Sequence, residues 1–300
     1  MKIIVIGGTG MIGAHIAVQL AASGHDVAIG ARKAPQETTE LTKFPLVLGD
    51  YVEGTYTKEQ LQGFDAVVFC AGNDIRHLPE GADFDAHCMR ANAEAVPAFA
   101  KLCRDAGVRK FVNVGSFYPH VAPQMIETNA YVRSRQLAFE GLCALSGPDF
   151  TVCSVDAPFV VGAIPGLSVP MFEYYTQYAE GKLEGMPVFG PAGASNFIST
   201  LSLAEAVEGA LERGENCKAY LVGDENMTFA QYFQLYFEAA GNPQDVPSLD
   251  QEHPLLPDSA IYTGRGSTVS YEPDPDAAAL GFRRNDIRRA VQDMVAQYRS

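Results

Sequence analysis

The stretch that decides the fold is residues 1–33, MKIIVIGGTGMIGAHIAVQLAASGHDVAIGARK. Residues 2–6 are short, apolar and rich in β-branched side chains, which predicts a buried strand, and the glycines after them follow the spacing G-x-x-G-x-x-G. Apolar residues then recur at helical spacing up to Ser23, and residues 26–31 predict a second strand. Strand, glycine-rich turn, helix and strand form a βαβ unit, whose turn and helix N-terminus suit the pyrophosphate of a dinucleotide.

Three spaced glycines alone would be a weak signal, because many turns contain them. Here both strands and the helix lie within about 30 residues, as a dinucleotide-binding unit requires. A plain glycine-rich turn is the alternative.

The end of the second predicted strand distinguishes the two nicotinamide dinucleotides. An acidic residue there binds the ribose hydroxyl of NAD, whereas an arginine accommodates the 2′-phosphate of NADP. Ala31 stands at that position, followed by Arg32 and Lys33. Because a guanidinium donates two parallel hydrogen bonds to a phosphate, we predict NADP as the cofactor. Two solvated charges at a strand end are the alternative.

Composition excludes several classes of partner. The chain has 36 acidic and 22 basic side chains, and its net charge of -14 disfavours nucleic acid and anionic membranes. It has no apolar run of membrane-spanning length and no signal-peptide pattern, so we expect a cytoplasmic protein with a small-molecule substrate. The six cysteines form no C-x-x-C pair and predict buried free thiols. The histidines show no ligand spacing, so no metal site is predicted.

Strand and helix signals alternate through the first half of the chain. Further strands are predicted at 45–48, 66–70, 110–114 and 151–156, and helices at 57–61, 84–106 and 130–145. This alternation predicts an α/β fold with a doubly wound parallel sheet of Rossmann type. We assign it to residues 1–162, with return segments near 195–223. Residues 163–300 are expected to form mainly a smaller substrate-binding region, with residues 241–275 as a surface excursion.

Ser116, Tyr131 and Arg135 are the predicted catalytic residues. Tyr131 and Arg135 stand one helical turn apart in NAYVRSRQLAFE, and Ser116 ends the strand KFVNVGS. If this strand and helix are neighbours, the hydroxyl and the phenol converge on one substrate oxygen. Hydride transfer at the adjoining carbon needs such a proton donor, and the positive charge of Arg135 would favour the phenolate.

At this point the sequence resembles the short-chain dehydrogenase/reductase superfamily, in its extended, epimerase/dehydratase-like branch. The similar motifs are GGTGMIG at 7–13, LGD at 48–50, FDAVVFCAG at 64–72, VRKFVNVGSFY at 108–118 and DAPFVVG at 156–162. Tyr131 matches the tyrosine of Y-x-x-x-K. Arg135 stands at the lysine position, Asp156 replaces a usual arginine, and the interval from Ser116 to Tyr131 is shorter than in most extended members.

The resemblance, together with the glycines and the basic pair, implies a set of cofactor contacts. These are Gly7, Thr9, Gly10, Met11, Ile12, Gly13, Arg32, Lys33, Asp50, Tyr51, Cys70, Ala71, Gly72, Asn92, Pro158, Phe159 and Val160. Segments expected near the pocket mouth supply aromatic or soft side chains for the substrate. They are Phe117, Tyr118, Met171, Phe172, Tyr175 and Phe197.

We therefore predict an NADP-dependent oxidoreductase that reduces a carbonyl, or a carbon-carbon double bond conjugated to one, in a small apolar molecule. Sugar nucleotides fit less well, because Lys182 is the only cation in residues 162–193. Two alternatives remain open: an epimerase or dehydratase in which hydride leaves and returns, and a non-catalytic NADP-binding sensor. A homodimer is also expected, through apolar surface on the helices predicted at 84–106 and 130–145.

Overall fold

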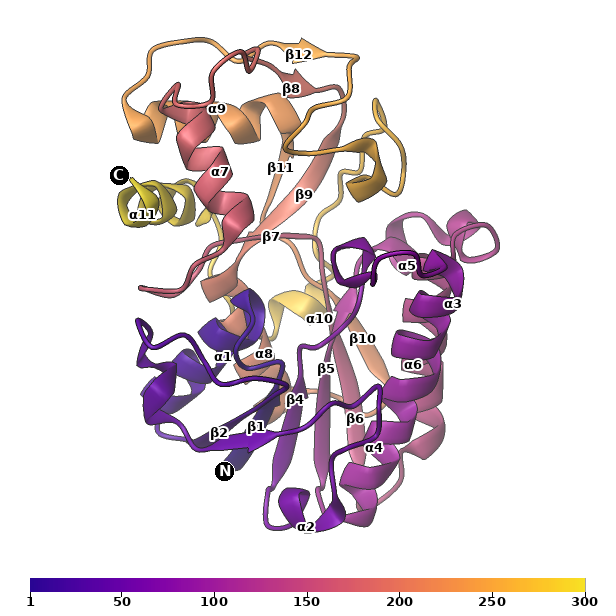
Figure 1. Cartoon of the computed structure of the whole chain (residues 1–300). Coiled ribbons are helices and arrows are strands. Elements are labelled where there is room, and N and C mark those ends of the chain that lie inside the picture. Colours follow the sequence, from indigo (N-terminus) through magenta and orange to yellow (C-terminus); the bar gives the residue numbers. More distant parts are fainter. Residues whose placement is uncertain (300) are drawn as a thin grey trace.

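The computed structural model describes residues 1–299, and a seven-stranded parallel sheet forms its larger lobe (Figure 1). The strand order is β10-β6-β5-β4-β1-β2-β3. The strands are β1 (Lys2–Ile6), β2 (Asp26–Ala31), β3 (Leu46–Leu48), β4 (Ala66–Phe69), β5 (Lys110–Ser116), β6 (Thr151–Ala157) and β10 (Lys218–Leu221). This doubly wound order confirms the predicted Rossmann-type α/β fold. All carboxyl ends of the strands therefore meet at one edge.

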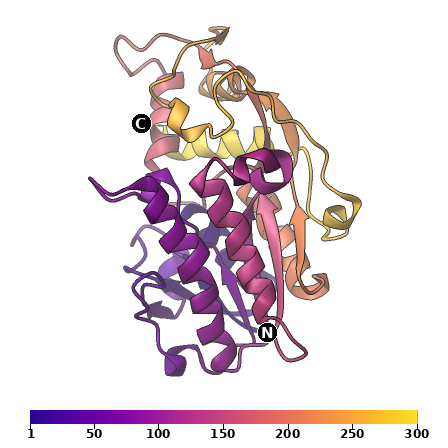
Figure 2. The same ribbon diagram turned by 90° about the vertical axis from the view of Figure 1, so that its right-hand side faces the viewer.

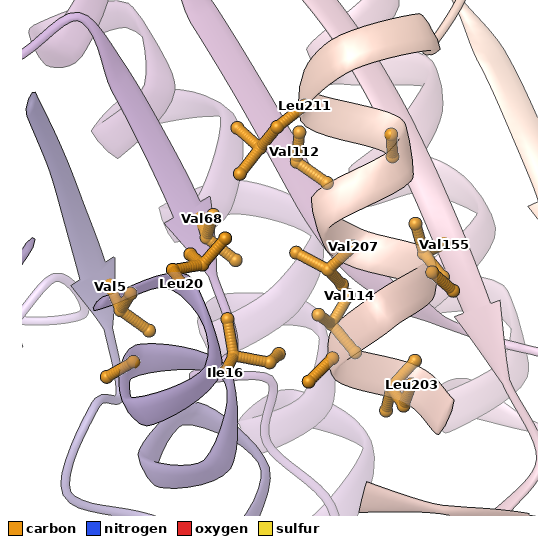
Figure 3. Packing of buried hydrophobic residues seen from close by; sticks show 14 of the residues in the cluster. Val5, Ile16, Leu20, Val68, Val112, Val114, Val155, Leu203, Val207 and Leu211 are labelled. Carbon is orange, nitrogen blue, oxygen red and sulfur yellow. The ribbon is translucent and has the colours of Figure 1, made fainter. Parts of the chain in front are cut away.

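Helices cover both faces of this sheet because each strand is apolar on both sides. On one face, α1 (Met11–Ala22) packs beside α8 (Thr200–Arg213). Figure 3 shows their Ile16, Leu20 and Val207 meeting the strand valines. On the other face, α4 (Ala95–Asp105) and α6 (Ala130–Leu145) lie side by side (Figure 2). Each such buried side chain contributes about 1.5–3 kcal/mol relative to exposure.

The helix expected at 84–106 is interrupted. It consists of α3 (Phe84–Cys88), a π-helical segment η3 (Met89–Glu94) and α4. A π-helical turn holds one more residue than an α-helical turn, so it changes which side chains point inward, and here Asn92 is completely buried. By contrast α6 has the predicted bounds, because the Asn129 side chain caps it by accepting a hydrogen bond from Val132 N at 3.0 Å.

The smaller lobe lies beyond the carboxyl ends of the strands (Figure 1). Its three-stranded sheet has the order β11-β9-β7, and a two-stranded sheet pairs β12 with β8. Aromatic residues of the helices fill its core. The elements are β7 (Phe159–Val161), α7 (Pro170–Ala179), β8 (Gly190–Pro191), β9 (Ala194–Ser199), β11 (Glu225–Thr228), α9 (Phe229–Ala240), β12 (Ser248–Leu249) and α11 (Ile287–Tyr298). Of the segment near 195–223, α8 and β10 join the larger lobe, whereas β9 joins the smaller one.

Short elements complete the chain. They are η1 (Glu40–Lys43), α2 (Lys58–Leu61), η2 (Ile75–His77), α5 (Tyr118–Val121), η4 (Pro123–Ile126), η5 (Asp258–Ala260) and α10 (Pro275–Ala278). Within residues 1–299, no helix is long and apolar enough to cross a membrane. The same residues hold no group of three His, Cys, Asp or Glu side chains arranged to bind a metal.

The expectation of buried cysteines is wrong for part of the set. Cys88, Cys103 and Cys153 are buried, Cys70 and Cys143 are half-buried, and Cys217 is exposed. Cys217 lies in the turn that leads into β10, where its neighbours Asn216 and Lys218 are polar and the turn is exposed, so no apolar surroundings bury its side chain.

We predict that Gly13→Ala destabilises the fold at the first turn of α1. A methyl group on Gly13 would lie 2.3 Å from the carbonyl oxygen of Gly7, so the turn or the helix would have to move. Such overpacking costs about 1–3 kcal/mol of the free energy of unfolding, measured by urea denaturation. Gly147→Ala is the matched control, because nothing lies within 4 Å of the added methyl group. Equal losses in both variants would contradict the prediction.

Candidate active site

A cleft crosses the carboxyl ends of β1, β2 and β4, and we call it the glycine cleft. Its volume is about 350 Å³. Twelve of the predicted cofactor residues line it: Gly7, Thr9, Gly10, Met11, Ile12, Gly13, Arg32, Asp50, Tyr51, Cys70, Ala71 and Gly72. The structure therefore brings together residues from four separate segments of the sequence.

The floor of the glycine cleft fits a pyrophosphate. Helix α1 begins at Met11, and no side chain caps its N-terminus at Gly10. The N–H groups of its first turn have no partner within the helix and stay available to an anion. Gly7 has φ 79°, and a methyl group on it would lie 3.1 Å from Ala71 N, so the backbone itself forms the surface. This open helix end beside bare backbone is what a dinucleotide requires.

Arg32 stands at the end of β2, on the rim of the glycine cleft. Its side chain is 70% exposed, and its guanidinium lies 4.0 Å from the Asp50 carboxylate. An ion pair of that length at the surface is weak, so it leaves Arg32 able to bind another anion. Lys33 is exposed and does not line the cleft, which corrects its predicted cofactor contact.

A second hollow, which we call the tyrosine cavity, continues from the glycine cleft toward the smaller lobe. It has a volume of about 220 Å³, and Met11, Ile12, Cys70 and Gly72 line both spaces. The other predicted residues on its wall are Ser116, Phe117, Tyr118, Tyr131, Arg135, Pro158, Phe159, Val160, Met171 and Tyr175. The three predicted catalytic residues thus face one cavity.

Strand β5 and helix α6 position the catalytic candidates. Ser116 is the last residue of β5, and its Oγ accepts a hydrogen bond from Tyr118 N at 3.4 Å. One turn after Tyr131, the Arg135 guanidinium lies 6.0 Å from the centroid of the Tyr131 ring. The Arg135 Nη2 donates to Val114 O at 2.6 Å. A cation therefore stands beside the phenol, held by the end of the neighbouring strand.

Gly72 makes room for the arginine. A methyl group on Gly72 would lie 1.9 Å from Arg135 Nη1, in direct collision. The guanidinium therefore lies against Gly72, in the loop after β4, while it is bonded to Val114 O in β5, and it lines the tyrosine cavity.

Tyr262 is the functional candidate that the sequence did not indicate. Its ring stacks on that of Tyr131, with centroids 4.5 Å apart and an interplanar angle of 18°. Its hydroxyl accepts from Ile75 N at 3.4 Å, and burial raises the pKa of Tyr262 well above its usual range. The predicted surface excursion 241–275 thus closes one side of the cavity. The sequence carries no signal for this, because the two tyrosines lie in unrelated segments.

Several other predicted contacts are corrected. Phe172 and Phe197 are completely buried in the core of the smaller lobe and do not line the cavity. Asn92 lines neither the glycine cleft nor the tyrosine cavity. Its Oδ1 accepts a hydrogen bond from Asn73 N at 3.0 Å, and its Nδ2 donates one to Asn73 O at 2.9 Å. Asn92 therefore fixes the loop after β4. Cavity residues missed by the sequence also include Asp74, Ile75, Arg76, Val161, Phe229, Tyr232, Leu256 and Ala260.

A buried polar chain lies directly behind Ser116. Asn113 Nδ2 donates to Ser154 Oγ at 2.9 Å, and Ser154 Oγ donates to Asp156 Oδ1. Asp156 Oδ2 lies 2.6 Å from His120 Nε2, and this hydrogen bond raises the pKa of His120. Ser116, His120, Arg135 and Asp156 together line a third cavity of about 170 Å³. A titratable pair therefore lines a cavity that it shares with Ser116 and Arg135.

Residues 3–145 match the NAD dependent epimerase/dehydratase family. The solved structures with a similar fold include the protein gox2253, at 20% identity and a TM-score of 0.77 over 99% of this chain and 97% of that one. UDP-glucose-4-epimerase from Stenotrophomonas maltophila, solved with NAD and formylated UDP-arabinopyranose, matches at 19% and 0.76 over 100% and 98%. UDP-N-acetylglucosamine 4-epimerase from Bacillus cereus matches at 15% and 0.72 over 99% and 96%. The chain shares their fold over nearly its full length.

We predict that His120→Gln loses stability in a pH-dependent way. Asp156 holds the folded-state pKa of His120 above its unfolded value. The pair therefore stabilises the fold fully below about pH 6.5, the ordinary histidine value, and this contribution disappears as pH rises through the raised pKa. Urea denaturation should show the largest difference from wild type near pH 5.5 and a smaller one at pH 8.5. His25→Gln, at the opposite edge of the sheet, is the control. A difference that grows with pH would refute the pairing.

Proposed function

We propose that the protein is an NADP-dependent oxidoreductase of the NAD dependent epimerase/dehydratase family, whose model residues 3–145 match. Its substrate would be a small apolar molecule with a carbonyl, or a carbon-carbon double bond conjugated to one. One observation carries this proposal: Ser116, Tyr131 and Arg135 face a cavity that is otherwise walled mainly by aromatic and aliphatic side chains and opens into the glycine cleft.

The chain's own residues supply the proton and hold the substrate oxygen. When bound, NADPH supplies the hydride to the carbon of that group. The Tyr131 hydroxyl donates its proton to the oxygen, and Ser116 Oγ donates a hydrogen bond to the same oxygen. The Arg135 cation beside the ring stabilises the phenolate left on Tyr131. Tyr262 stacks on the Tyr131 ring and shields it from water.

Charge and size favour a small neutral substrate. The cations on the cavity wall are Arg76, which pairs with Asp74 at 2.5 Å, and Arg135, which is bonded to Val114 O. The charge of Arg76 is balanced by a carboxylate, so Arg135 alone would face the two charges of a diphosphate. The volume of about 220 Å³ also lies below the usual range of roughly 300–1,000 Å³ for drug-sized ligands.

The proton that Tyr131 donates would be replaced through His120 and Asp156. An arginine has too high a pKa to pass protons on, so Arg135 holds charge but cannot act as a relay. The His120–Asp156 pair lies across the third cavity from Ser116 and Arg135. Its imidazole, 29% exposed, can take protons from solvent. The other charged or titratable groups acting on it are Asp274 and, through Asp156, Tyr271.

An epimerase or dehydratase is the second candidate, favoured by the family match and by the two 4-epimerases of similar fold. In that case the hydride returns, and turnover consumes no NADPH. A non-catalytic NADP-binding protein would bind the cofactor and turn over no carbonyl compound. For the assembly we propose a homodimer through α4 and α6, where Leu137 remains 36% exposed.

We predict that the protein binds NADPH at least tenfold more tightly than NADH. Arg32 would form charge-assisted hydrogen bonds to the 2′-phosphate, each worth about 1.5–3 kcal/mol. Arg32→Ala should remove this preference. Lys33→Ala is the matched control and should keep most of it, because Lys33 does not line the cleft. Fluorescence titration of the wild type and both variants with both reduced cofactors measures the six affinities. Equal wild-type affinities would overturn the assignment of NADP.

We predict that Tyr131→Phe removes at least 99% of carbonyl-dependent NADPH oxidation while NADPH affinity stays within twofold. The lost hydroxyl acts mainly in the transition state, and such proton donors contribute about 10²- to 10⁴-fold. Arg135→Lys should stay active because it keeps the charge. Arg135→Ala should weaken cofactor binding and move the pH optimum upward. A panel of small apolar ketones, aldehydes and enones supplies the substrates, and Tyr174→Phe, at a side chain 52% exposed on α7, is the control.

The outcomes of this panel separate the candidate functions. Unchanged turnover in Tyr131→Phe would refute the assigned proton donor. If the wild type binds NADPH but oxidises it with no member of the panel, the epimerase and sensor candidates take precedence. A UDP-sugar that is converted without net NADPH consumption would then identify the epimerase.

A further inference from the structure

Two cysteines from distant parts of the chain meet at the end of α6. Cys143 lies in the last turn of that helix, and Cys217 lies in the turn before β10. The Cys217 thiol donates a hydrogen bond to the carbonyl oxygen of Cys143 at 3.7 Å, which places the two cysteines next to each other. No metal cluster involves them within the described residues.

The backbone holds Cys217 in this position. Its φ is 56°, in the left-handed region that non-glycine residues seldom occupy. Its N–H donates to Val152 O at 2.7 Å, and the neighbouring Asn216 side chain accepts from Val152 N at 3.0 Å. These bonds to β6 aim the thiol at α6 rather than leaving it on a free loop.

The two thiols are chemically unequal. Cys217 is exposed, so a dissolved oxidant can reach it. Burial, together with the contact to Cys217, raises the pKa of Cys143 to about 12, which keeps that group protonated at neutral pH. Because thiolates are the reacting form, the exposed sulfur is the one to react first.

Ser146 completes the arrangement. Its hydroxyl donates to Cys143 O at 2.8 Å and lies 3.0 Å from Cys217 Sγ. If the hydroxyl turns its proton from this carbonyl to the sulfur, it can stabilise negative charge on Cys217 during the reaction. A nucleophilic sulfur, a hydrogen-bond donor and a second thiol are therefore assembled at one exposed place.

We propose that Cys143 and Cys217 form a redox-active pair that hydrogen peroxide converts into a disulfide. The Cys217 thiolate attacks one peroxide oxygen, the O–O bond breaks, and the leaving hydroxide takes up a proton to become water, which leaves a sulfenic acid on Cys217. The Cys143 sulfur then attacks the Cys217 sulfur, gives up its proton, and releases the sulfenic oxygen as a second water. Two thiols lose two electrons, and the peroxide gains them. A small dithiol reverses the reaction.

The disulfide would act on stability rather than on the active site. It joins the end of α6 to the sheet edge at β10 and closes a long loop, which restricts the unfolded chain. Cys143 lies twelve residues beyond Tyr131 on the same helix, and a rise of 1.5 Å per residue separates them by about 18 Å. We therefore expect oxidation to raise the Tm by several degrees and to leave NADPH affinity within twofold.

The test treats the full chain with a small excess of hydrogen peroxide, alkylates the remaining thiols after unfolding, and maps the unreduced digest by mass spectrometry. The expected product is a Cys143–Cys217 linked peptide that dithiothreitol removes, with the buried Cys88, Cys103 and Cys153 still alkylated as internal controls. Cys143→Ser should leave a Cys217 sulfenic acid that dimedone traps. Cys217→Ser should abolish both products, and Ser146→Ala should slow disulfide formation several-fold.

Three results would overturn the proposal. One is a Cys217 sulfinate in the wild type without the linked peptide, and another is linkage of either residue to a different cysteine. The third is equal peroxide consumption by the wild type and Cys217→Ser. None of these readouts needs a substrate, so the proposal fails or holds independently of the oxidoreductase function. A melting curve and an NADPH titration of the oxidised protein check the expected shift and the unchanged affinity.

Discussion

The architecture depends on a close approach between α1 and the turn after β1. At Gly13 only a hydrogen atom separates the helix from the carbonyl oxygen of Gly7, where a methyl carbon would lie at 2.3 Å. This contact sets the height of α1 above the sheet and aims its uncapped first turn across the ends of the central strands. With the helix end fixed there, the positive pole of α1 and the carboxyl ends of β4 and β5 open onto one continuous space.

Gly72 and Gly115 likewise leave space for a functional group because they have no side chain. Gly72 accommodates the guanidinium of Arg135, and Gly115 accommodates the Asp156 carboxylate, whose Oδ1 would lie 1.6 Å from an added methyl group. Both glycines follow or end a central strand. The two residues that depart from the pattern of the resembled family are thus each matched by a glycine, Arg135 by Gly72 in the loop after β4 and Asp156 by Gly115 on the neighbouring strand, which indicates a specific local structure around them.

Local patterns predicted the elements well because strands and helices are encoded by nearby residues. Helix α6 has its predicted bounds because an asparagine cap and a continuous helical pattern agree. The sequence did not predict the π-helical segment, because one extra residue in a turn leaves the spacing of apolar residues along the sequence nearly unchanged. Phe172 and Phe197 were misassigned for another reason: an aromatic residue near a pocket can face either the pocket or the core, and packing of the whole lobe decides which. Tyr262 and the Cys143–Cys217 pair depend on contacts between distant segments.

The arginine at position 135 and the aspartate at position 156 can be interpreted together, because the fold brings these distant parts of the sequence to one place. Both line the third cavity, together with Ser116 and His120. An arginine keeps its charge at every physiological pH and so stabilises a phenolate without exchanging protons. The histidine beside Asp156 is the group in that cavity whose charge changes near neutral pH, and the carboxylate favours its protonated form. In the proposed reaction, charge stabilisation and proton exchange, which a single lysine can combine, would be divided between Arg135 and His120. The division would make the reaction sensitive to pH through His120 and insensitive through Arg135.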